Sequence, residues 1–192
     1  MGFIKDFITN YYPEMPRESR LRFRQLISYK VFKKNEIIIN AGVKPTHFYI
    51  LKSGVARSFF IDKNHNEYIA TLFVPDRIIG SLSAMIKSEK SKLTYDCLTE
   101  CEVFIVSYKD FMDATKDDIY LALMYVKFLE YAFIKMELKT HQLSNLDATE
   151  RYFALKEDIT DIENLIPQYH IASYLNITPV QLSRIRKEIL YK

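Results

Sequence analysis

The sequence predicts an α+β fold in which an antiparallel, β-rich part is followed by a long helix and a small helical part. Three observations support this prediction. Short β-rich runs alternate with turn residues over 31–108, apolar residues recur at helical spacing over 109–145, and residues 166–190 form two short amphipathic segments around a tight turn. With 192 residues, of which 48% are hydrophobic, the chain has room for one large or two small domains with an ordinary core.

The amino-terminal segment, residues 1–30, is predicted to be helical, because its apolar residues recur at helix-like intervals that Pro13 and Pro16 interrupt. Acidic and polar residues come too early for a signal peptide, and no apolar run approaches the roughly 20 residues that span a bilayer. We therefore expect a cytoplasmic protein with no membrane segment.

Six β-rich runs follow, spaced roughly 8–12 residues apart, which favours a small antiparallel sandwich or barrel. The runs are 36–40, 47–51, 55–61, 67–74, 92–98 and 101–106. The clearest hairpin turns are Ser53-Gly54 and 63–66. Cys97 and Cys101 are the only cysteines, and we expect both to be reduced core residues, since no metal-ligand pattern accompanies them.

Residues 109–145 are predicted to form one long helix that joins two copies of the chain. A 3-4 rhythm typical of a coiled-coil seam runs through Ile119, Ala122, Val126, Leu129, Phe133, Met136, Thr140 and Leu143. A second apolar face consists of Leu121, Met124, Phe128 and Tyr131. We expect a homodimer, the alternative being one broad stripe that faces the core of a monomer. Asp147, with Glu150 three residues later, is typical of a capping box and marks a hinge.

The carboxyl-terminal segment predicts a helix-turn-helix. Ile171, Ala172 and Leu175 form an apolar face, Asn176 suits a left-handed turn, and Thr178-Pro179 is a typical helix start. The apolar residues of the second helix are Leu182, Ile185 and Ile189, and its polar residues project elsewhere. Such a helix fits the major groove of double-stranded DNA, the alternative being a helical hairpin with a solvated basic face. The net charge of +3 is too small to decide, although residues 178–192 are locally basic.

The order of these elements resembles the Crp/Fnr family of bacterial transcription regulators, and most closely its short-tailed members of the Bacteroidetes type. Ile39–Gly42, Tyr49–Gly54 and Pro75–Gly80 match the family's opening strands, glycine turn and approach to the phosphate cassette. The resemblance implies a double-stranded β-helix (a jelly-roll-like β-roll) in an effector domain over 1–146, which includes the dimerisation helix 109–145. It also implies a DNA-binding domain over 147–192 that lacks a full wing.

The phosphate cassette departs from the family pattern. Cyclic-nucleotide-binding members have a Gly-Glu-Leu triplet and, ten residues after its Glu, an Arg that clamps the phosphate. In this chain the triplet is Gly80-Ser81-Leu82, and Ser91-Lys92 stands at the position of the clamp. Each lost charged hydrogen bond costs roughly 1.5–3 kcal/mol. We therefore expect no useful affinity for cyclic AMP, although Lys92 can partly substitute as a point charge.

The resemblance places an effector pocket at Gly80, Ser81, Leu82, Ser83, Ser91, Lys92, Met136 and Glu137. Either an unidentified small molecule binds there or the roll is filled and has no ligand. The family's iron–sulfur sensors carry an amino-terminal cysteine cluster, which this chain lacks before Cys97, and no axial haem ligands stand out. We expect no metal and no cofactor.

The resemblance assigns DNA contacts to Thr178, Val180, Gln181, Ser183, Arg184, Arg186 and Lys187. Arg184 is the expected base-edge or phosphate contact, whereas Val180 stands where many members have an acid and can touch a thymine methyl. The expected function is a dimeric DNA-binding transcription regulator that does not respond to cyclic AMP. The alternative is a ligand-sensing or protein-interaction module with a vestigial helix-turn-helix. An enzyme is not expected, since the sequence has no nucleophile elbow and no phosphate-binding glycine loop.

Overall fold

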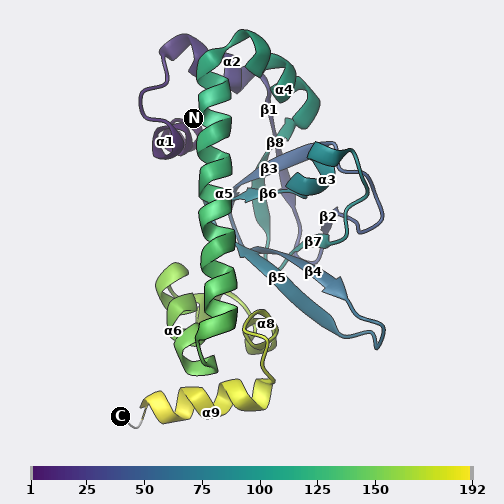
Figure 1. Cartoon of the computed structure of the whole chain (residues 1–192), viewed down its shortest axis with the longest axis vertical. Coiled ribbons are helices and arrows are strands. Elements are labelled where there is room, and N and C mark those ends of the chain that lie inside the picture. The colour runs from purple at the N-terminus through teal and green to yellow at the C-terminus, as the bar shows by residue number, and fades with distance from the viewer. Residues whose placement is uncertain (1, 191–192) are drawn as a thin grey trace.

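The computed structural model describes residues 2–190 and confirms the α+β fold. Two four-stranded antiparallel sheets form a roll beside one long helix, and a small helical domain lies at one end (Figure 1). Two predictions lie outside the described residues. They are the contribution of Lys192 to the basic excess and the lack of a full wing. Within residues 2–190 no helix combines the length and apolar character needed to cross a bilayer.

The sheets have the strand orders β1-β8-β3-β6 and β2-β7-β4-β5. The first sheet contains β1 (Ile27–Phe32), β8 (Cys101–Ser107), β3 (His47–Ser53) and β6 (Ile78–Ile79), and the second contains β2 (Ile37–Ile39), β7 (Thr94–Cys97), β4 (Ala56–Ile61) and β5 (Glu67–Phe73). Side chains from both sheets meet in one core, in which Cys97 and Cys101 are buried and free.

The amino-terminal prediction is wrong for one segment. Helices α1 (Gly2–Tyr11) and α2 (Arg17–Gln25) are as expected, but β1 begins at Ile27, whereas the helical prediction extended to residue 30. This strand pairs with β8 along its whole length, from Ile27 opposite Val106 to Phe32 opposite Cys101. Pairing with a distant strand therefore overrides a helix-like local spacing. A short helix, α3 (Leu82–Lys87), was also not predicted.

The predicted single helix 109–145 is two helices, α4 (Tyr108–Asp117) and α5 (Ile119–Asn145). Asp118 separates them, with an extended backbone at φ −133° and ψ 100°. Its carboxylate accepts the Tyr120 and Leu121 amides, which caps the amino terminus of α5. The long helix thus begins at Ile119, ten residues later than predicted.

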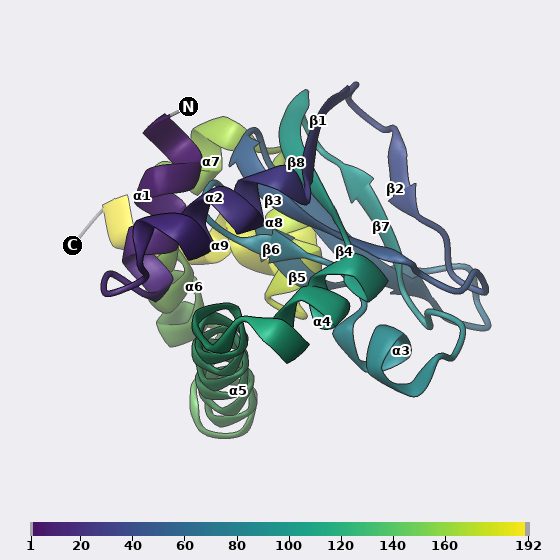
Figure 2. The same ribbon diagram turned by 90° about the horizontal axis from the view of Figure 1, so that it is seen from above.

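Helix α5 has two different apolar faces, as the sequence predicts. Leu121 and Met124 are buried in a core with the amino-terminal helices, and Tyr11 of α1 lies edge-on to Phe128 and Tyr131. The seam is exposed, with 46% of Val126, 61% of Phe133, 62% of Met136 and 47% of Leu143 accessible. Figure 2 shows α5 at the edge of the molecule, away from the sheets.

The helical domain contains α6 (Ala148–Asp158), α7 (Ile162–Leu165), α8 (Gln168–Tyr174) and α9 (Pro179–Leu190). Asp147 begins it with the predicted capping box, completed by Glu150. This domain shares one buried core with the roll, so the two parts are packed together. The core includes Val55, Phe59, Ile69 and Leu72 of the roll and Ile171, Ala172, Leu175 and Leu182 of the helical domain.

Candidate DNA-binding helix and effector groove

The turn between α8 and α9 has the predicted geometry. Asn176 adopts a left-handed conformation with φ +56°. The Gln181 amide donates to Thr178 Oγ1 at 3.2 Å, and the Thr178 amide donates to Gln181 Oε1 at 2.9 Å. These reciprocal bonds form a capping box that begins α9, so the Thr178 and Gln181 side chains stabilise the helix start. Leu182 and Ile185 are buried and hold α9 against α8.

The opposite side of α9 is exposed. Val180, Arg184 and Lys187 lie at i, i+4 and i+7, which places them on one stripe of the helix. Val180 is 71% exposed, and Ser183 is also exposed beside this stripe. The face therefore offers one apolar contact and two cations to a partner.

The sequence predicts that Arg186 projects freely from α9, but the structure pairs it with an acidic residue. Its Nε donates to Glu163 Oε1 of α7 at 2.7 Å. Glu163 also accepts from the Tyr152 hydroxyl and pairs with Lys156 at 3.2 Å. Partial burial of Glu163 favours protonation, but these hydrogen bonds and charges outweigh it and lower the pKa of the carboxyl. Arg186 thus ties α9 to its own domain.

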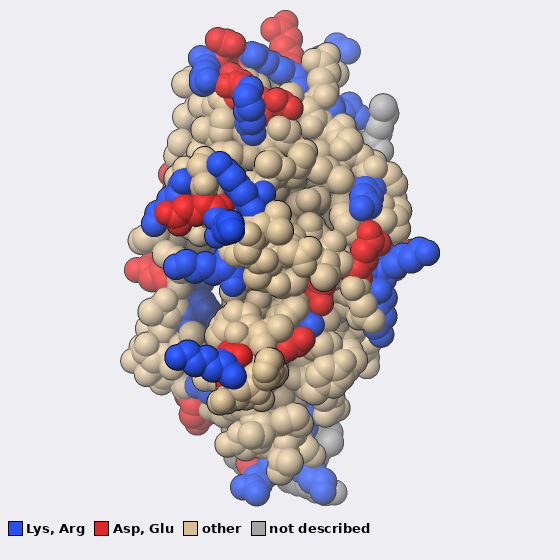
Figure 3. Space-filling view, turned by 90° about the vertical axis from the view of Figure 1, so that its right-hand side faces the viewer, with Lys and Arg blue, Asp and Glu red and all other residues tan. Residues whose placement is uncertain are grey.

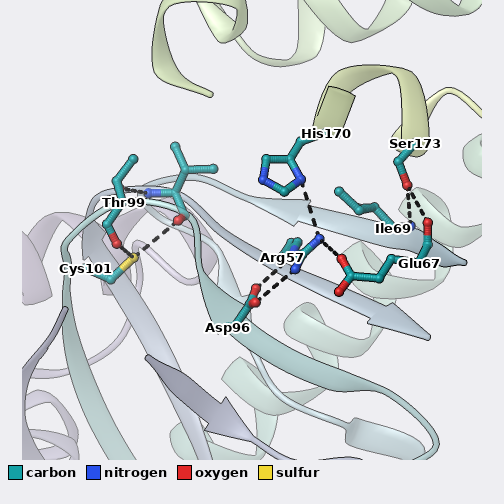
Figure 4. Close-up of polar contacts among 9 residues, drawn as sticks. Arg57, Glu67, Ile69, Asp96, Thr99, Cys101, His170 and Ser173 are labelled. Atoms are coloured by element: carbon teal, nitrogen blue, oxygen red, sulfur yellow. Dashed lines mark hydrogen bonds and ion pairs between the residues drawn. The ribbon is translucent and has the colours of Figure 1, made fainter. Parts of the chain in front are cut away.

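A buried polar cluster joins the roll to α8, and nothing in the sequence analysis anticipated it (Figure 4). Arg57 of β4 donates Nε to Asp96 Oδ1 at 2.8 Å and Nη2 to Asp96 Oδ2 at 3.0 Å, while Nη1 donates to Glu67 Oε2 at 2.7 Å. His170 Nδ1 lies 3.4 Å from the same Nη1. Burial, and then the charge of Arg57, lower the pKa of His170 to about 4. The ring is therefore neutral at physiological pH.

Ser173 of α8 adds backbone bonds to this junction. Its Oγ donates to the Glu67 carbonyl and accepts from the Ile69 amide, both at 3.1 Å. Strand β5 and helix α8 are thus joined by hydrogen bonds as well as by apolar packing. An arginine inside the β-rich run 55–61 is the one sequence signal that points to such a cluster, since a buried cation needs acidic partners.

A groove of about 1070 Å³ runs between the roll, α5 and α6. Six of the predicted effector-pocket residues line it, namely Gly80, Ser81, Leu82, Ser83, Lys92 and Met136. Ser91 and Glu137 do not, which corrects the prediction. Ser91 is buried, and its hydroxyl donates to the Leu93 carbonyl at 2.7 Å. Glu137 is exposed elsewhere on α5, because consecutive helical residues point about 100° apart.

Cations outnumber acids along this groove. The cations are Arg77, Lys87, Lys90, Lys92, Lys135 and Lys139, and the acids are Glu89, Glu157 and Asp158. Figure 3 shows a hollow on this face with Lys and Arg side chains around it. The groove can therefore attract an anion electrostatically.

Residues 29–118 match the family model described as a cyclic nucleotide-binding domain. No curated protein sequence matches the chain. Among solved structures, FixK2 from Bradyrhizobium japonicum has a TM-score of 0.73 at 16% identity, covering 86% of this chain and 85% of that one. A protein from Eubacterium rectale described as a transcriptional regulator of the Crp/Fnr family has a TM-score of 0.71 at 17% identity, with 95% and 88% covered.

The c-di-GMP-responsive regulator CLP from Xanthomonas campestris has a TM-score of 0.68 at 17% identity, with 92% of each chain covered. Each of these likenesses covers at least 86% of this chain. They confirm the predicted resemblance at the level of the fold.

Proposed function

We propose that this chain, which carries a cyclic nucleotide-binding-type domain at 29–118 within the fold of the Crp/Fnr regulators, is a homodimeric DNA-binding transcription regulator. The observation that carries the proposal is the construction of α9. Leu182 and Ile185 fix the helix to α8, and the stripe of Val180, Arg184 and Lys187 is exposed. A supported helix with one free basic face is what the major groove of double-stranded DNA accepts.

The proposed dimer interface is the α5 seam. Phe133 and Met136 are each more than half exposed, although both are large and apolar. Burying such a stripe against a second copy stabilises the assembly by about 25 cal/mol for each Å² of apolar surface removed from water. A two-fold axis along this seam gives the assembly two copies of α9, which suits operator half-sites about 34 Å apart.

The groove supports a response to something other than cyclic AMP. Ser81 offers no carboxylate, and Ser91 is buried with its hydroxyl engaged by Leu93. A bidentate phosphate clamp requires a guanidinium at such a position. The groove therefore has room for an effector but lacks the expected clamp for a cyclic phosphate.

Selection of double-stranded oligonucleotides from a random pool tests the proposal. We expect the full chain to enrich a two-fold symmetric motif, and Arg184→Ala to lose that enrichment. Lys5→Ala, which removes an exposed cation from α1, is the matched control and should enrich the same motif. A dimer that enriches no sequence would contradict DNA binding and favour the ligand-sensing or protein-interaction module.

A further inference from the structure

The helical end of the groove holds three cations around one carboxylate. Asp158, at the carboxyl end of α6, pairs with Lys135 Nζ of α5 at 2.6 Å and with Arg77 Nη2 at 3.0 Å. Lys139, one turn after Lys135, lines the same end. The Asp158 carboxylate is already shared by Arg77 and Lys135, and even with Glu157, which also lines the groove, these three cations exceed the neighbouring carboxylates by one charge.

Lys139 has an unusual environment for a lysine. Its ammonium lies 3.5 Å from the centroid of the Tyr174 ring and donates to the Tyr174 carbonyl at 3.4 Å. No carboxylate pairs with it within the described part of the chain. Burial, and then the charge of Arg151, lower the pKa of Lys139 to about 8, and Asp158 only partly opposes them. Lys139 is thus a largely buried ammonium that has no carboxylate in contact with it among residues 2–190.

Arg151 supplies an independent observation. Its Nη1 donates to the Leu146 carbonyl at 2.6 Å, but its Nε is buried and has no hydrogen-bond partner among residues 2–190. Buried donors without an acceptor are rare in proteins. Arg151 does not line the groove, so it adds to the positive charge near Lys139 without itself contacting a ligand there.

We propose that this end of the groove binds a small organic anion, through a carboxylate or phosphate group seated between Lys139, Lys135 and Arg77. Ammonium and guanidinium groups form charge-assisted hydrogen bonds to such oxygens. The aromatic rings of Tyr131 and Tyr174 line the same space and can pack against the organic part of the ligand. The site differs from the roll end of the groove, where Lys87, Lys90 and Lys92 gather.

Binding there would act on the contacts that hold the helical domain. Asp158 belongs to α6, while Arg77 belongs to the roll and Lys135 to α5. An anion that takes bonds from Arg77 and Lys135 competes with Asp158 and loosens this connection. This regulatory consequence rests on the proposed function, whereas the binding site itself does not.

Titration calorimetry of the full chain with malonate and with inorganic phosphate tests the site. We expect saturable millimolar binding of at least one anion, with malonate the stronger if the natural group is a carboxylate and phosphate the stronger if it is a phosphate. Lys139→Met keeps an unbranched side chain beside Tyr174 and removes the charge, so it should weaken binding about tenfold or more. Lys127→Met, which changes an exposed lysine of α5 outside the groove, is the matched control and should leave affinity unchanged, whereas Lys92→Met tests the roll end of the groove.

Two results would overturn the site: no saturable heat with either anion, or a loss of binding in Lys92→Met but not in Lys139→Met. Thermal unfolding of all three variants establishes that each is folded. These titrations contain no DNA. A chain that binds DNA but neither anion therefore refutes the site alone, and one that binds an anion but no DNA supports the site while refuting the proposed function.

Proton uptake gives a second readout. An anion at Lys139 favours the charged ammonium and raises its pKa, so at pH close to 8 the chain should take up protons as malonate binds. Calorimetry in two buffers with different ionisation enthalpies measures this uptake. We expect it in the unmodified chain and in Lys127→Met, and not in Lys139→Met. Equal uptake in all three chains would overturn the role of Lys139.

Discussion

Arg57 Nη1 lies 3.4 Å from His170 Nδ1, although the two residues are 113 positions apart in the sequence. Arg57 belongs to β4 of the roll and His170 to α8 of the helical domain. The Arg57 guanidinium is always charged and can only donate, so the facing Nδ1 of His170 must accept the hydrogen bond. This nitrogen can accept only while the His170 ring is neutral. The junction between the two parts of the chain therefore depends on a histidine that stays unprotonated.

This arrangement predicts a pH dependence of stability. In the unfolded chain His170 takes up a proton near pH 6.5, whereas in the fold its pKa is about 4. Between these values the unfolded state binds more protons, so the free energy of unfolding falls as the pH drops and is independent of His170 above that window. The slope from this one group is at most about 1.4 kcal/mol per pH unit.

Urea unfolding at about pH 7.5 and about pH 5.5 measures this slope, at values above those where most carboxylates titrate. His170→Gln cannot titrate and should show a flatter dependence. His141→Gln, which changes an exposed histidine of α5, should retain the slope of the unmodified chain. An identical slope in all three chains would show that His170 does not contribute.

Local signals were sufficient to predict the turn between α8 and α9. Asn176 and Thr178 specify a left-handed turn and a helix cap from their own chemistry, and the structure has both. The same holds for the capping box at Asp147. These features form within a few residues of one another, so a pattern along the chain is enough to predict them.

Features that depend on distant partners were missed. Strand β1 forms because β8 lies beside it, and Arg57 is buried because Asp96, 39 residues away, neutralises it. The apolar rhythm runs from Ile119 to Leu143, entirely within α5, so it gave no information on the break at Asp118 that separates α5 from α4. Ser91 and Glu137 were placed in the pocket by resemblance, but neither lines the groove.

The exposed seam of α5 predicts that Phe133→Asp converts the dimer to a monomer. In the seam the new carboxylate would be removed from water without a partner, which costs several kcal/mol. Sedimentation velocity measures the change in mass. Ile134→Asp is the matched control, since Ile134 is the next residue, is 52% exposed and points about 100° away from the seam. A dimer that survives Phe133→Asp but not Ile134→Asp would assign the interface to a different face.

The groove predicts that cyclic AMP does not bind with useful affinity. Ser81 and Ser91 replace the two charged groups that bind its ribose and phosphate in cyclic-nucleotide-binding relatives, and each such bond contributes roughly 1.5–3 kcal/mol. Calorimetry at millimolar ligand should show no saturable heat. Micromolar binding would contradict the prediction and would indicate that Lys92 or another groove cation supplies the missing clamp.

DNA binding should depend on Arg184 for sequence selectivity and on Lys187 for general affinity. Arg184 lies one turn into α9, two residues after buried Leu182, where a recognition helix faces base edges, whereas Lys187 lies one turn further along. Loss of a base contact costs about 1–3 kcal/mol on the specific sequence only. Loss of a phosphate contact weakens binding to all sequences alike and lowers the salt slope by about one. Arg184→Ala and Lys187→Ala are compared on specific and scrambled duplexes at two salt concentrations. Equal losses for both variants on both duplexes would make Arg184 a backbone contact, and base recognition would then fall to the exposed Val180 or to the free amide nitrogen of Gln181.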